Sequence, residues 1–156
     1  MDMNNRIRRA SQAVALQCLY SITSRYPEDK EATNESVESI IAHSQSETKI
    51  RDEELSEEYV RTIMDGVTKH QEKLANLIEP FLSPGWTLDR IAKVVQIILF
   101  MAAYEILHSD VKHSTIINDY LEIAKAFNHK GEVGFINSVL DKVAKSGAKT
   151  ILMKKS

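Results

Sequence analysis

The sequence predicts an all-α protein, a compact bundle of about six to seven helices. Only five Gly and three Pro are spread over 156 residues, which disfavours turn-rich β architecture. Apolar residues also recur at three- and four-residue steps along most of the chain. A chain of this length, with 43% hydrophobic residues, can bury one ordinary core. We therefore expect residues 1–156 to form a single domain.

The N-terminal half predicts one long helix, a variable region and a second long helical segment. Helical spacing of apolar residues predicts the first helix over about Asn5 to Arg25, and Pro27 ends it. Residues 37–41 predict only a short, marginal helix. The helical pattern resumes over residues 56–81, where Gly66 and the length of the segment leave room for a kink near residues 69–71.

Three further helices are expected after the Pro84-Gly85-Trp86 turn. Thr87 can cap a helix that reaches Leu107, and Ser114 can cap one that reaches Phe127. The last helix is expected over residues 132–143, with Gly147 as its stop and residues 146–156 as a frayed basic tail. The run over residues 94–107 is the most apolar, but its roughly 14 residues are too few for a membrane span of about 20. It is expected to be the central core helix.

Charge is unevenly distributed, although the formal net charge is only −2. Residues 1–25 carry net +3, residues 26–58 carry eleven acids against three bases, and the remainder carries net +3. The acidic 28–58 segment is expected to be a solvated, variable helix-loop region. A mildly acidic chain can therefore still present a basic end.

Cysteine usage and the N-terminus favour a cytoplasmic protein. Cys18 is the only cysteine, so no intramolecular disulfide is possible, and its place in an apolar helical pattern indicates a buried thiol. The chain start leads directly into an amphipathic segment rather than an apolar signal region. Neither secretion nor membrane insertion is expected.

No residue pattern indicates catalysis, a metal or a cofactor. The five His are scattered, and a single Cys cannot complete a Cys-rich site. Gly131 and Gly134 lack the preceding strand that a nucleotide-binding loop requires. The remaining feature is the Arg-rich helix start, where Arg6, Arg8 and Arg9 are expected to stay in water and can meet phosphates. The alternative interpretation of these three residues is an ordinary solvated helix end.

Four blocks of sequence, in order, resemble the NusB family. An Arg-rich start enters a helix that ends Gln17-Cys18-Leu19-Tyr20, which is similar to the family's N-terminal signature. Residues 86–91 with 98–106 resemble the family's central helix. Residues 117–127 resemble the helix that follows it, and residues 135–141 resemble the last helix. Together the blocks span residues 6–142.

This resemblance implies a cytoplasmic bacterial antitermination factor. Such a factor pairs with NusE, a small-subunit ribosomal protein, and binds the single-stranded boxA element of ribosomal RNA transcripts. The complex then acts on elongating RNA polymerase, which places the polymerase among the indirect partners. Some family members self-associate through the face that otherwise meets NusE, so a homodimer is possible.

The resemblance also assigns candidate residues. The family's RNA contacts imply roles for Arg6, Arg8, Arg9, Tyr20, Phe127, Phe135 and Asn137, and Lys130 adds a nearby base. For the aromatic residues, core packing remains the alternative, since Tyr20 can close the core beside its helix. NusE is expected to meet the start of the central helix, at Arg90, Lys93 and Gln96. The three Arg and Lys130 neutralise few phosphates, so the chain alone is expected to bind RNA weakly and with a shallow salt dependence.

Two other functions remain open. One is a protein-interaction scaffold with weak or no RNA binding, which the acidic segment makes plausible. The other is an RNA-binding fragment of a 5-methylcytosine RNA methyltransferase, since NusB-like domains also occur in such enzymes. The second requires a further α/β domain, and the sequence shows no strand pattern.

Overall fold

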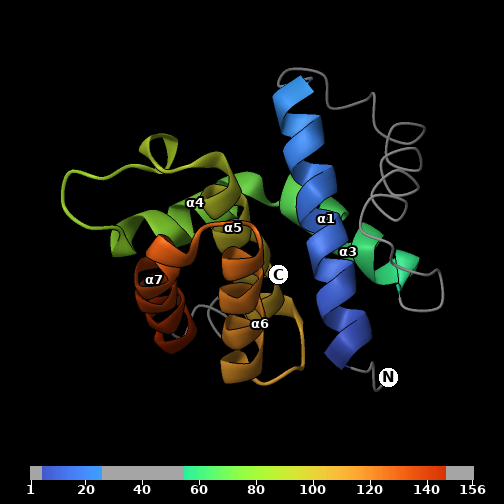
Figure 1. Cartoon of the computed structure of the whole chain (residues 1–156). Helices are drawn as coiled ribbons and strands as arrows, with labels where there is room; N and C mark the ends of the chain where they lie inside the picture. The colour runs from blue at the N-terminus through green and yellow to red at the C-terminus, as the bar shows by residue number, and fades with distance from the viewer. Residues whose placement is uncertain (1–4, 26–54, 147–156) are drawn as a thin grey trace. The chain divides into compact units, whose positions relative to one another are not determined.

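The expected all-α class is confirmed. A computed structural model describes residues 5–25 and 55–146, which contain α-helices and short 3₁₀ turns and no strand (Figure 1). The elements are α1 (Asn5–Arg25), α3 (Glu57–Lys69), α4 (Gln71–Ile78), η2 (Glu79–Phe81), η3 (Leu88–Arg90), α5 (Lys93–His108), α6 (His113–Ala126), η4 (Lys130–Glu132) and α7 (Val133–Lys145).

The chain divides into an N-terminal unit, residues 1–65, and a C-terminal unit, residues 66–156. The boundary falls within α3. The single domain expected over residues 1–156 stays a prediction, as do the helix at 37–41, most of the acidic region at 28–58 and the tail beyond Ser146, which lie outside the described residues.

Within the N-terminal unit, polar contacts join α1 to the start of α3. The Ser11 hydroxyl donates to the Ile7 carbonyl at 2.7 Å and accepts from the Ser56 backbone N–H at 3.0 Å. The Ser56 hydroxyl in turn accepts from the Tyr59 backbone N–H at 3.2 Å, which satisfies an otherwise unpaired donor in the first turn of α3. The Gln12 amide also donates to the Tyr59 hydroxyl at 3.5 Å. These contacts fix where α3 begins.

Within the C-terminal unit, α5 is the central helix, as its apolar sequence predicts. Eleven of its sixteen residues are buried, and it packs against α4, α6 and α7. The one buried charged side chain of α5 is Glu105, and Tyr120 of α6 donates a hydrogen bond to its carboxylate. A buried carboxylate is costly unless it is hydrogen-bonded, so this contact holds α6 against α5.

Gly66 lies beside Tyr104 of α5, and the expected kink follows it. α3 ends at Lys69 and α4 begins at Gln71, with His70 at φ −110° and ψ 22° between them, which confirms the kink. A Cβ atom added to Gly66 would lie 2.1 Å from the Tyr104 ring. Tyr104 itself packs beside His108, with ring centroids 4.5 Å apart. Only glycine at position 66 leaves room for this ring.

Two expected helix starts are wrong. Thr87 does not cap the central helix, because its hydroxyl bonds Asp89 within a short 3₁₀ turn and the extended backbone of Ile91 (ψ 144°) separates that turn from α5. The α6 helix begins at His113, so Ser114 lies inside the first turn rather than at the cap. In both places the hydrophobic period identified the helix, but local backbone geometry set its first residue.

We predict that Gly66→Ala destabilises the protein by about 1–3 kcal/mol, because the Tyr104 ring must leave its position. The melting temperature should fall by roughly 2–4 °C for each kcal/mol of lost stability in a chain of this size. Gly134→Ala is the matched control, since a Cβ there meets nothing within 4 Å. Equal melting temperatures for the two variants would contradict the close packing at Gly66.

Candidate nucleic-acid interface

One face of α1 presents three of the expected RNA-binding side chains together. Arg6, Arg9 and Tyr20 are exposed, and Tyr20 is 43% accessible. At about 100° per residue these positions fall within roughly 60° of one another around the helix, over a length of about 21 Å. Ala13 lies between them and is small. We call Arg6, Arg9, Ala13 and Tyr20 the α1 strip. The exposure of Tyr20 excludes the core-packing alternative for this residue.

Arg8 differs from its neighbours. Its side chain is buried, with 6% accessibility, so the expectation that all three N-terminal arginines stay in water is wrong. Residues two positions apart on a helix point about 200° away from each other, so Arg8 points away from Arg6. Arg8 lies on the side of α1 that carries Ser11, Ala15 and Leu19. Arg8 is thus placed among core positions and is not part of the α1 strip.

In the C-terminal unit, a defined turn carries the chain from α6 to α7. The His129 N–H donates to the Ala124 carbonyl at 2.7 Å, and the Asn128 N–H donates to the Lys125 carbonyl at 3.2 Å. The backbone of Asn128 has φ 66°, in the left-handed region that asparagine tolerates. This pairing is a Schellman motif, which caps the last carbonyls of α6 and reverses the chain.

This turn is flanked by the two expected aromatic residues. Phe127 stands at the end of α6 and Phe135 in the first turn of α7, and both are half-buried. Lys130 is exposed in the short 3₁₀ turn between them. A half-buried ring is held on one side and open on the other, which suits stacking on a base. Phe127, Lys130 and Phe135 form what we call the α6–α7 connector site.

Asn137 lies on a different side of α7 from Phe135. The buried residues Ile136 and Val139 define the inward face of α7, and Phe135 and Asn137 flank that face about 200° apart. Asn137 instead lines a groove of about 450 Å³ between α6 and α7. Grouping Asn137 with the connector site is therefore not supported by the helix geometry.

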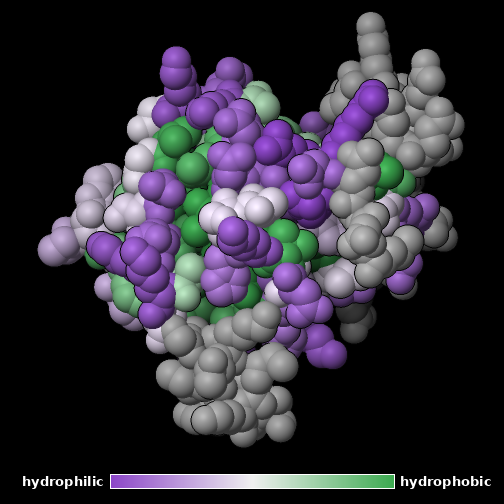
Figure 2. Space-filling model, turned by 90° about the horizontal axis from the view of Figure 1, so that it is seen from below, coloured by the Kyte–Doolittle hydropathy of each residue, from purple (hydrophilic) through white to green (hydrophobic). Residues whose placement is uncertain are grey.

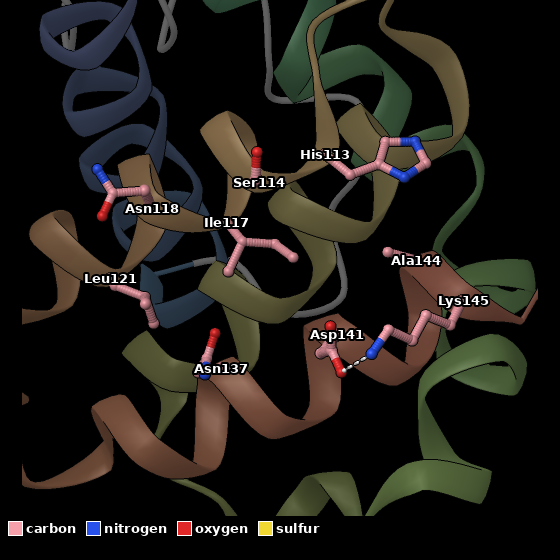
Figure 3. A pocket seen from close by; sticks show the side chains of 9 residues that line it. All are labelled: His113, Ser114, Ile117, Asn118, Leu121, Asn137, Asp141, Ala144 and Lys145. Atoms are coloured by element: carbon pink, nitrogen blue, oxygen red, sulfur yellow. Dashed lines mark ion pairs between the residues drawn. The ribbon is translucent and has the colours of Figure 1, made fainter.

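The α6/α7 groove has an apolar floor and a polar rim (Figure 3). Ile117 and Leu121 of α6 and Asn137 of α7 extend into the space between the helices, while an ion pair of 3.1 Å between Asp141 and Lys145 lies toward the end of α7. Because its cation is already paired, the groove offers little net charge to a phosphate. The surface drawn in Figure 2 likewise mixes apolar and hydrophilic side chains.

The expected partner-facing residues lie around the start of α5. Arg90 and Lys93 are exposed, whereas Gln96 is half-buried and its amide donates to the Ile91 carbonyl at 2.6 Å. Gln96 therefore closes the loop that precedes α5. Just before this group stands Trp86, which is 54% exposed. Trp86 was not among the predicted partner-binding residues; a tryptophan between Pro-Gly and a polar segment was the available signal for a surface residue.

Neither metal nor thiol chemistry is favoured where the structure describes the chain. Nowhere in residues 5–25 and 55–146 do three His, Cys, Asp or Glu side chains gather closely enough to hold a metal ion. Burial raises the pKa of the Cys18 thiol from 9.0 to about 12, and the positive charge of Arg61 only partly opposes this shift. A thiol that remains protonated at neutral pH is a poor nucleophile. Across the same residues, no helix is long and apolar enough to cross a membrane.

The fold and surface thus define a class of all-helical proteins with exposed aromatic and cationic side chains at the helix faces and connections. Comparison with known proteins identifies the family. The NusB family profile matches residues 9–145, and the chain belongs to the NusB family. It is a transcription antitermination factor by family, not an enzyme.

Named relatives and solved structures agree with this assignment. The transcription antitermination protein NusB of Acetivibrio thermocellus is 34% identical over 139 residues, covering 88% of each chain. That of Syntrophotalea carbinolica is 33% identical, covering 92% of this chain and 96% of the relative. The structure of T. maritima NusB superimposes with a TM-score of 0.69 at 25% identity over 93% of each chain. A complex described as antitermination factors NusB and NusE with dsRNA matches in fold, with a TM-score of 0.70 at 21% identity over 90% of this chain and 98% of its own.

The Cys18 thiol should make stability pH-dependent in the alkaline range. Its pKa is higher in the folded than in the unfolded chain, so its contribution is complete below about pH 9 and is lost as pH rises toward 12. We predict that Cys18→Ala unfolds in urea with a smaller loss of stability between pH 8 and pH 10.5 than the wild type. Other groups titrate in both proteins, so the difference isolates Cys18; parallel pH profiles would refute the prediction. A thiol reagent at pH 8 should label Cys18 only after denaturation.

Proposed function

We propose that this chain binds boxA-type single-stranded RNA of nascent ribosomal RNA transcripts together with NusE, and so helps RNA polymerase to elongate through terminators in the bacterial cytoplasm. Family membership supplies the antitermination role. The observation that carries the RNA contact is the α1 strip, where two guanidinium groups and an exposed aromatic ring share one helix face.

The chemistry of the strip suits a single strand. Arginine side chains pair with phosphates and fix the position of the backbone, while an aromatic ring accepts a splayed base on its face. The α6–α7 connector site offers the same combination, with Lys130 between two half-buried phenylalanines. We propose both as RNA contacts, with Asn137 as a separate contact at the α6/α7 groove.

Few cations are available, and this supports the need for NusE. Arg6, Arg9 and Lys130 neutralise about three phosphates at most, and each contact on a single strand contributes a slope of about −0.7 in log K against log salt. Such a protein binds weakly at physiological salt. A second RNA-binding protein on the same complex raises the overall affinity by making the second contact intramolecular.

We predict that Arg6→Glu combined with Arg9→Glu lowers the affinity of the chain, with NusE present, for a boxA oligonucleotide by at least tenfold. The salt slope should become shallower by about 1.4, because two phosphate contacts are lost. Fluorescence anisotropy over a salt series measures both quantities. Arg8 is left unchanged, since a substitution at this buried residue tests folding rather than RNA contact.

The matched control for this variant is Lys69→Glu combined with Lys73→Glu. Both lysines are exposed on other helices, and the change in net charge is the same. If both double variants lose affinity equally, general charge rather than the α1 strip attracts the RNA. If the Arg variant loses its RNA affinity and still supports antitermination, RNA contact is not needed for the activity and the scaffold alternative is correct.

Tyr20→Ala tests the stacking contact separately. Losing one stacked base costs about 1–3 kcal/mol, which corresponds to a roughly five- to 150-fold loss of RNA affinity. The salt slope should not change, because no charge is removed, and Tyr20→Phe should retain most of the affinity. An unchanged affinity for Tyr20→Ala at every salt concentration would remove Tyr20 from the RNA interface.

A further inference from the structure

Trp86 is the chain's only tryptophan, and slightly more than half of its surface is open to water. It stands in the long loop between α4 and α5 (Figure 1). Two residues later, Leu88 is buried at 8% accessibility and holds the same loop to the core. The loop therefore exposes the larger apolar side chain while burying the smaller one. A solitary exposed apolar residue is common on protein surfaces, so the case rests on how this one is held.

The backbone around Trp86 is fixed by several hydrogen bonds. The Trp86 N–H donates to the Ser83 carbonyl at 2.9 Å, which closes a turn over Gly85 at φ 84°. The Arg90 guanidinium donates to the Gly85 carbonyl at 3.1 Å. Thr87 and Asp89 are bonded to each other in the following 3₁₀ turn. The indole is thus presented on an ordered turn, which lowers the entropy that a partner must remove on binding.

The charge of this loop favours a protein over RNA. Between Glu79 and Lys93 the sequence holds two acids and two bases, so the segment has no net charge. One of the bases, Arg90, already bonds the backbone of the turn. RNA gains little binding free energy from a neutral surface, because its affinity for proteins comes mainly from the counterions released when cations meet its phosphates. Tryptophan, by contrast, is the residue most often found as the central anchor of protein interfaces.

We propose that Trp86 is the anchor of the surface that binds the protein partner, inserting into an apolar pocket on that partner while the ammonium group of Lys93 meets a carboxylate at its edge. The inference rests on the proposed function, in which that partner is NusE. It adds a residue outside the Arg90, Lys93 and Gln96 group, and it assigns Arg90 a positioning role through its bond to the Gly85 carbonyl.

The single tryptophan makes the first experiment direct. Adding purified NusE to the full chain should shift the emission of Trp86 to shorter wavelength and reduce its quenching by acrylamide. Trp86→Phe mixed with NusE supplies the background from the partner. A shift produced by boxA RNA without NusE would overturn the inference in favour of an RNA contact. A shift that appears only on concentrating the chain alone would overturn it in favour of self-association.

Calorimetry with variants provides the second test. Trp86→Ala should weaken NusE binding at least 30-fold, while Trp86→Phe should lose less and Lys73→Ala, on the exposed side of α4, should change the affinity less than twofold. The indole is largely exposed, so Trp86→Ala should melt within a few degrees of the wild type. Arg90→Ala should weaken binding less than Trp86→Ala, because it acts by positioning the turn.

The outcomes separate the inference from the function on which it rests. If wild-type chain binds NusE but Trp86→Ala binds equally well, the anchor is refuted and the antitermination complex stands. If the wild-type chain does not bind NusE with or without boxA RNA, the proposed function fails and the anchor fails with it.

Discussion

A helix buried on nearly every side must be enclosed by other helices, and α5 imposes this requirement on the C-terminal unit. Its buried residues face α4, α6 and α7. Two local adjustments make the enclosure possible: the Tyr120 hydroxyl satisfies the buried Glu105 carboxylate, and Gly66 leaves space for the Tyr104 ring. Since an unsatisfied buried charge or a displaced ring would cost several kcal/mol, the positions of α6 and of the α3–α4 kink both depend on α5.

This enclosure leaves the side chains proposed to be functional at the ends and outer faces of helices. Trp86 and Arg90 precede α5 in an ordered loop, and Phe127 and Phe135 flank the Schellman turn after α6. Each is held by backbone hydrogen bonds that belong to the fold rather than to a ligand. Such sites are preformed, because the scaffold has already restricted the chain before binding. The fold itself does not select the ligand; the side chains placed on it do.

The hydrophobic period predicted the α-helices of the described residues but not the direction of each side chain. It identified the central helix, which rests on many residues in phase, whereas Gly66 and the length of the 56–81 segment indicated the kink after α3. It failed for Arg8, because neighbouring arginines on a helix point in different directions and only the packing decides which one is buried. It also failed at Thr87, where a side-chain bond to Asp89 competes with helix capping. Phe135 and Asn137 were predicted together as RNA contacts, but their side chains point about 200° apart around α7.

Under the proposed function, the cations of the α1 strip and the neutral Trp86 loop have different partners. The α1 strip offers two cations to RNA, too few to hold it alone, and the Trp86 loop offers the proposed apolar anchor but no net charge. Charge mainly governs encounter and salt dependence, whereas a desolvated aromatic anchor governs the lifetime of a protein complex. A factor built this way keeps its protein partner as salt rises while its own RNA contact weakens. In the proposed assembly RNA affinity is therefore a property of the complex, and the isolated chain should discriminate poorly between RNA sequences because phosphate contacts and base stacking are both sequence-tolerant.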